Sequence, residues 1–176
     1  MKQRVFVAFV LLPILLGNVC AQASAELVRL DEKLTRHFEK AMPNWKHERV
    51  EPMAGSGNNV LIEFWSFSNR KVKISVLLHK SVAEAEAVMQ NHAKYSLNKQ
   101  TLTGLGDEAY ASGYGSSDVA FRRGKFTVYV STTVDVDADA DAQGFTQGQR
   151  SEREKAEMQR WSKEFAQHVV SAMDAL

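Results

Sequence analysis

Four aspartates near the end of a predicted strand are the residues whose types and spacing most clearly suggest chemistry. They are Asp135, Asp137, Asp139 and Asp141, and they alternate with valine and alanine. Hard cations such as Ca²⁺ bind several carboxylate oxygens that converge on one point. One interpretation of this segment is therefore a calcium site formed by these four residues.

The helix–loop–helix calcium-binding loop fits this segment only in part. With Asp137 at its first position, the third and fifth positions are also aspartates, but Ala142 replaces the turn glycine and Gly148 replaces the bidentate glutamate. The other interpretation is that residues 135–150 form an acidic, soluble loop that discourages pairing at the sheet edge. We favour the loop, and we expect no cofactor unless calcium binds there.

General acid–base catalysis is a second chemistry that we considered. His92 and Glu63 would form an acid–base pair if the fold brought them together. The five histidines lack the short helical spacing of a zinc motif. No Gly-x-Ser-x-Gly elbow occurs, and the sole cysteine, Cys20, lies in the amino-terminal segment. We therefore predict that the protein is not an enzyme, with a His92–Glu63 site as the alternative.

Aromatic and basic side chains indicate a binding surface. Trp65 and Phe67 occupy one face of a predicted strand and Phe64 the other, so one of these faces is an exposed strip if helices cover only one side. Arg122 and Arg123 lie near a hairpin end, where they would meet an anionic partner or be solvated. We predict Trp65, Phe67, Arg122 and Arg123 as partner-binding residues.

Three segments have the apolar spacing of amphipathic helices. The first runs from Glu26 to Met42 and ends before Pro43. The second starts at the capping box Ser81-Val82-Ala83-Glu84 and ends before Asn98. The third starts at a similar sequence, Ser151-Glu152-Arg153-Glu154. In each box we expect the serine and the glutamate to accept hydrogen bonds from each other's main-chain amides.

Six segments have strand-like sequences, and short turns join most of them. They are Asn44–Glu51, Val60–Phe67, Lys71–Leu78, Glu108–Tyr114, Asp118–Arg123 and Lys125–Asp137. Hairpins rather than helical crossovers connect most of these segments. The predicted fold is therefore α+β, with an antiparallel six-stranded sheet in the order α-βββ-α-βββ-α and helices packed on the sheet.

The amino terminus, residues 1–23, has the three-part layout of a secretory signal peptide. A basic start precedes the apolar run Val5–Leu16, which is shorter than the roughly 20 residues of a membrane-spanning helix. Ala21-Gln22-Ala23 supplies a small-x-small cleavage site, and cleavage as late as Ala25 is compatible. A retained anchor and lipid attachment at Cys20 are the alternatives.

Cleavage would leave one domain, residues 26–176, with no cysteine and no stable membrane span, in the periplasm or outside the cell. Removing Lys2 and Arg4 lowers the 22 basic residues to 20, against 21 acidic ones. This balance does not favour a nucleic-acid partner.

Three motifs in the second half of the chain carry a family resemblance. They are Gly104-Leu105-Gly106-Asp107-Glu108-Ala109-Tyr110, Val119-Ala120-Phe121-Arg122-Arg123-Gly124 and Val128-Tyr129-Val130. Together they resemble a hairpin that recurs in small secreted bacterial domains of the PsbP-like type, which include extracytoplasmic sensor and lipoprotein modules. The resemblance implies an antiparallel sheet packed by helices, without known catalytic residues. No functional residue carries over from it.

These observations predict an exported, non-enzymatic binding or accessory module of the bacterial envelope. Its partner would be a protein or a small ligand in the cell envelope. The alternatives are a calcium-binding exported protein that uses the acidic loop, and an enzyme with an unrecognised site.

Overall fold

A computed structural model describes residues 24–50, 58–138 and 143–174. The helices are α1 (Ala25–Ala41), α2 (Val82–Tyr95) and α3 (Gln147–Asp174), and the short 3₁₀ turns are η1 (Tyr114–Ser116) and η2 (Val136–Ala138). The strands are β1 (Lys46–Val50), β2 (Val60–Phe67), β3 (Arg70–Leu78), β4 (Gln100–Thr101), β5 (Glu108–Ser112), β6 (Asp118–Arg123) and β7 (Phe126–Val134). All pair antiparallel in one sheet, in the order β1-β2-β3-β7-β6-β5-β4.

The predicted class, α+β with an antiparallel sheet, is confirmed, but the predicted strand number is not. The sheet has seven strands rather than six, and the chain order is α-βββ-α-ββββ-α. The additional strand, β4, is two exposed polar residues that pair with Tyr110 and Ala111 of β5. Two such residues show no alternation of polar and apolar side chains, so only their main-chain pairing makes them a strand.

Two predicted strands end earlier than expected, because the chain has no partner to pair with beyond those points. The last residue of β7, Val134, pairs with Arg70, which is the first residue of β3. Beyond it the main-chain amide of Asp135 donates to the carbonyl of Asn69 at 2.9 Å, and η2 begins. At the end of β5, Gly113 has a φ of +82° and turns the chain into η1.

The sequence predicts caps for α2 and α3; α2 begins at the predicted serine, and the cap of α3 lies elsewhere. Ser81 Oγ accepts from the Glu84 amide at 3.1 Å, whereas the Glu84 carboxylate accepts from the amide of Lys80 and not from that of Ser81. For α3 the predicted cap at Ser151 is wrong. Thr146 and Gln149 form the reciprocal box: Thr146 Oγ1 accepts from the Gln149 amide at 3.3 Å, and Gln149 Oε1 accepts from the Thr146 amide at 2.9 Å.

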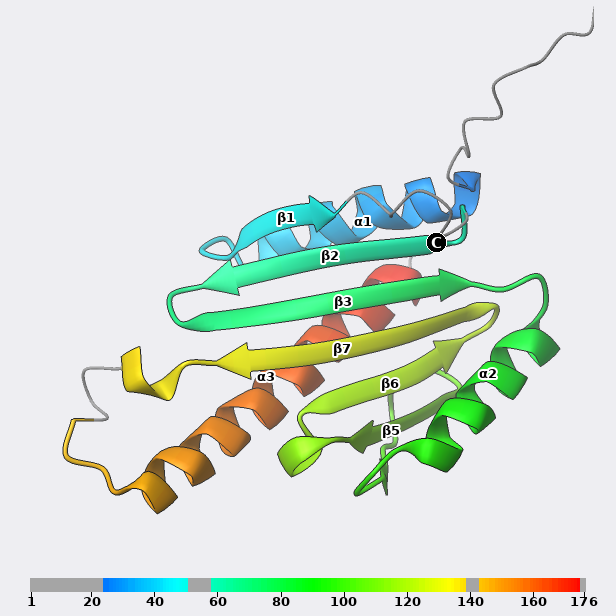
Figure 1. Cartoon of the computed structure of the whole chain (residues 1–176). Coiled ribbons are helices and arrows are strands. Elements are labelled where there is room, and N and C mark those ends of the chain that lie inside the picture. Colours follow the sequence, from blue (N-terminus) through cyan, green and yellow to red (C-terminus); the bar gives the residue numbers. More distant parts are fainter. Residues whose placement is uncertain (1–23, 51–57, 139–142, 175–176) are drawn as a thin grey trace, which may run out of the picture.

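The main core lies between the sheet and the pair α1 and α3, which lie behind the sheet in Figure 1. We call this face of the sheet the inner face and the opposite one the outer face. Phe38 of α1 lies between Trp65 and Phe165, with ring centroids 4.9 Å from each. These ring contacts pack α1 and α3 against β2, so the inner face of the sheet is buried beneath the two helices.

The outer face of the sheet is covered by one helix and only in part. Helix α2 lies on it, in front of the sheet in Figure 1, and packs on β6 and β7 through Met89, which contacts Tyr110 and Ala120. No other helix of the described residues lies on this side (Figure 1). The outer face of β1, β2 and β3 therefore has no helix over it.

Candidate functional site

An apolar strip marks the uncovered part of the outer face. We define the outer strip as Val60, Ile62 and Phe64 of β2 with Leu77 of β3, all of them half-buried. The strand registers place these side chains on the opposite face from the buried residues Leu61 and Trp65. A half-covered apolar strip on a sheet is typical of a contact surface.

Lysines border the outer strip. Lys73 pairs directly across from Phe64 and is exposed. Lys71 Nζ lies 4.2 Å from the centroid of the Phe64 ring, which is a cation–π distance. Glu48 lies on the other side of Phe64, on β1. The strip therefore combines an apolar centre with charged borders, as protein-binding surfaces often do.

A groove adjoins this surface where α2 meets β7. It has a volume of about 320 Å³, and it is lined by Val88, Asn91, His92, Tyr95, Ser96 and Tyr129. We call it the outer groove. Tyr129 pairs with Ser75, which in turn pairs with Ile62, so one cross-strand row joins the groove to the strip. The two features form one continuous face.

His92 is held in the groove by a partner from the sheet. Its Nδ1 forms a short hydrogen bond with the hydroxyl of Tyr110, and Ser96 Oγ lies 3.3 Å from the same nitrogen. Tyr110 is buried, and burial raises the pKa of its hydroxyl. The ring of Tyr129 lies 4.6 Å from that of His92, and burial together with Tyr110 raises the pKa of Tyr129 to about 12. Both tyrosines are therefore neutral near pH 7.

A second polar cluster lies on the inner face, beneath α1. Glu63 has no exposed surface; its Oε2 accepts from Trp65 Nε1 at 2.9 Å and lies 3.6 Å from His47 Nε2. Its Oε1 and His47 Nε2 have no hydrogen-bond partner within the described residues. Next to them, Asp31 forms an ion pair of 2.8 Å with Arg49.

This environment keeps Glu63 protonated. Burial raises the pKa of its carboxyl group to about 8; the negative charge of Asp31 adds to the rise, and the Trp65 hydrogen bond works against it. Burial also lowers the pKa of His47, whose ring stacks on Trp65 at 4.3 Å. Near pH 7 both groups are therefore mainly neutral, which is the lower-energy state for groups with few polar partners.

The predicted acid–base pair, His92 with Glu63, is not brought together. Glu63 lies on the inner face with Trp65, and His92 contacts Tyr110 and Tyr129 on the outer face. Two other histidines do meet: His37 Nε2 and His168 Nδ1 are 3.0 Å apart between α1 and α3. Their separation of 131 residues in the sequence gave no signal of this contact.

The two predicted aromatic partner-binding residues differ in exposure. Trp65 has no exposed surface and is part of the core, so it offers no contact surface in this structure. Phe67 is 40% exposed at the end of β2, with its ring 5.9 Å from that of Trp45. The aromatic residue of β2 that faces outward is Phe64. Residues 61–67 alternate regularly, so the sequence predicts two faces but does not say which one the helices cover.

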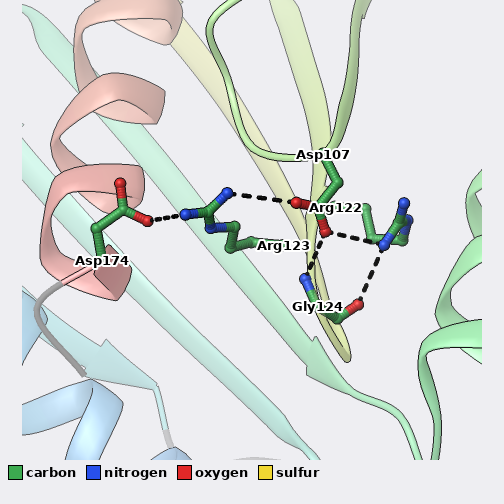
Figure 2. Close-up of polar contacts among 5 residues, drawn as sticks. All are labelled: Asp107, Arg122, Arg123, Gly124 and Asp174. Atoms are coloured by element: carbon green, nitrogen blue, oxygen red, sulfur yellow. Dashed lines mark hydrogen bonds and ion pairs between the residues drawn. The ribbon is translucent and has the colours of Figure 1, made fainter.

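The two predicted arginines belong to an internal network, shown in Figure 2. Asp107 Oδ2 accepts from Arg122 at 2.9 Å and from the Gly124 amide at 2.8 Å, and its Oδ1 accepts from Arg123 at 3.3 Å. Arg123 also pairs with Asp174 of α3 at 2.6 Å (Figure 2). Asp107 thus holds the hairpin between β6 and β7, and α3 is tied to the same hairpin.

The acidic segment is described only in part. Asp137 pairs with Arg150 of α3, and the main chain of Asp135 contacts Asn69. Asp139 and Asp141 lie outside the described residues. Within the ranges that the structure describes, no three histidine, cysteine or acidic side chains are arranged to hold a metal ion. The calcium site therefore stays an untested alternative to the acidic loop.

Comparisons of the chain with protein-family models, curated proteins and solved structures gave no match. The resemblance to PsbP-like domains therefore remains a prediction. What the structure defines is a class, an α+β protein with one antiparallel sheet. In the part of the chain that is described, no helix has the length and apolar character to cross a membrane.

Proposed function

We propose that this chain is an exported, non-enzymatic binding or accessory module of the bacterial envelope, located in the periplasm or secreted. It contacts a protein or a small ligand through the outer face of its sheet. The observation that carries this proposal is the asymmetric cover of the sheet. Two helices pack on the inner face, whereas among the described residues the outer strip has no helix over it, and the outer groove lies beside it where α2 meets β7.

The buried cluster of Glu63, His47 and Asp31 gives less support to an enzyme than the outer face gives to a binding module. A catalytic acid or base must come within hydrogen-bond distance of a substrate. Glu63 has no exposed surface, and α1 lies over it. The outer groove, in contrast, is open to ligands.

The test is crosslinking of the tagged protein in its native host, with mass spectrometry of the captured molecules. A double variant, Ile62→Thr with Phe64→Thr, removes apolar surface from the outer strip and places threonine, a residue with high strand propensity, at both positions of β2. Val28→Ala is the matched control, because Val28 is an exposed apolar residue of α1, on the far side of the sheet. The wild type and the control should capture the same partner in stoichiometric amounts, and the double variant should lose it.

Circular dichroism and thermal unfolding establish that the double variant folds. A folded double variant that captures the same partner as the wild type contradicts a role for the outer strip in the contact. Reproducible turnover of a substrate by the pure protein contradicts the non-enzymatic assignment.

A further inference from the structure

The lining of the outer groove has a specific chemical character. It contains two aromatic rings, Tyr95 and Tyr129, together with an imidazole, an amide and a hydroxyl. Tyr95 is 71% exposed and lies at the carboxyl-terminal end of α2. The lining contains no lysine, arginine, aspartate or glutamate, although Lys94 lies beside it with Nζ 5.4 Å from the Tyr95 ring centroid.

Several hydrogen-bonding groups of this groove have no hydrogen-bond partner among the described residues. The side-chain polar groups of Asn91, Tyr95 and Tyr129 make no hydrogen bond within the described residues, and neither does His92 Nε2. His92 Nδ1, in contrast, is engaged by the buried Tyr110. A hydrogen bond from the sheet to one ring nitrogen fixes the orientation of a histidine and leaves the other nitrogen for a ligand.

These features select among ligand classes. An anionic or cationic ligand would have no counter-charge in the lining. A purely apolar ligand would cover the amide, imidazole and phenol groups without bonding to them, and each polar group buried without a partner weakens binding. A sugar ring meets both requirements, because its C–H faces stack on aromatic rings while its hydroxyls donate and accept hydrogen bonds.

We propose that the outer groove binds the ring of a neutral saccharide. The ring stacks on the tyrosines, and its hydroxyls bond to Asn91 and to the free nitrogen of His92. The volume, about 320 Å³, is at the small end of ligand pockets, which begin at about 300 Å³, so it accommodates one or two rings. This inference rests on the proposed function, because it names the ligand class of the same face.

The experiment is saturation-transfer NMR with the purified protein and named probes. The probes are glucose, galactose, N-acetylglucosamine, maltose and cellobiose, with glucose 6-phosphate and phenol as charged and aromatic comparators. We expect transfer to the ring protons of at least one neutral sugar. Tyr95→Ala and Asn91→Ala should each weaken its binding about tenfold. Tyr114→Ala is the matched control, since Tyr114 is another exposed tyrosine and lies outside the groove; it should not change binding.

Three outcomes would overturn the inference. One is no transfer to any neutral sugar. Another is equal loss of binding in the Tyr114→Ala control, and the third is phenol binding that exceeds sugar binding and survives Asn91→Ala. If the sugars fail while the outer-strip variant still loses its captured partner, the proposed function stands and only the ligand class is wrong. If the sugars bind and the strip variant captures normally, the groove alone carries the binding function.

Discussion

Glu63 and Trp65, two residues apart on β2, face the core together, and the Trp65 indole donates a hydrogen bond of 2.9 Å to the Glu63 carboxyl group. Neither side chain has any exposed surface. A carboxyl group in this position costs stability whenever it is ionised, because water is excluded and Asp31 carries a like charge nearby. The sheet therefore contains a group whose titration should be visible in the stability of the whole protein.

The first prediction concerns the pH dependence of unfolding. The pKa of Glu63 is about 8 in the folded protein and about 4.5 when unfolded, so the folded state binds one more proton between these values. Its contribution to stability is complete below pH 4.5 and is lost as the pH rises to 8, by about 1.4 kcal/mol per pH unit. Urea unfolding should show that the wild type loses stability relative to Glu63→Gln as the pH rises. Between pH 5 and pH 8 the free energy of unfolding of the wild type should fall by up to about 4 kcal/mol relative to that of the variant.

Glu157→Gln is the control for this prediction, with the opposite sign. Burial works against ionisation of Glu157, but the Trp161 indole and Arg70 outweigh it and lower its pKa. Its stabilising contribution is present above pH 4.5 and is lost as the pH falls through the lower, folded pKa. Parallel pH profiles for wild type and Glu63→Gln would contradict the buried-acid assignment.

The second prediction concerns the Asp107 network of Figure 2. Asp107→Ala should lower the free energy of unfolding by about 1–3 kcal/mol, because the Gly124 amide and the largely buried Arg122 lose their acceptor. Asp174→Ala removes only the exposed pair with Arg123 and should cost less than about 1 kcal/mol. Chemical denaturation of both variants measures the difference. Equal losses would show that Asp107 does not hold the hairpin.

The third prediction tests where α3 begins. Thr146→Ala removes the observed cap and should destabilise the protein by about 1 kcal/mol. Ser151→Ala lies inside the helix and removes only an exposed hydrogen bond to Tyr114, so its effect should be smaller. Thermal unfolding compares the two variants. A larger loss of stability for Ser151→Ala than for Thr146→Ala would support Ser151 as the cap of α3.

The fourth prediction concerns calcium. Because Asp137 already pairs with Arg150, we expect the acidic loop to bind no calcium with measurable affinity. Isothermal calorimetry should show no saturable heat, and removal of metal with EDTA should leave the melting temperature unchanged. Replacing Asp135, Asp137, Asp139 and Asp141 with asparagine provides the comparison. Saturable binding that this variant loses would establish the site.

Local patterns in the sequence determined the elements of this protein. The apolar spacing from Glu26 to Met42 predicted α1, Ser81 predicted the start of α2, and strict alternation predicted β2. A glycine before β5 allows a tight entry into the strand. Gly106 has a φ of +59°, and a Cβ there would lie 2.3 Å from the Arg122 carbonyl oxygen. These features depend on neighbours in the chain, so the sequence displays them directly.

Only the tertiary structure decided which faces and which distant partners those elements use. An alternating strand presents two faces, and helix packing alone made Trp65 core and left Phe64 facing outward. The pairing of β3 with β7 and the contact of Tyr110 with His92 join segments that have no common local signal. The cap of α3 lies at Thr146 rather than at Ser151, because Thr146 and Gln149 exchange hydrogen bonds there and the helix already begins at Gln147. The candidate site consists of contacts between segments that are distant in the sequence. Which side chains such contacts bury or expose depends on the whole fold, so local sequence patterns do not show it.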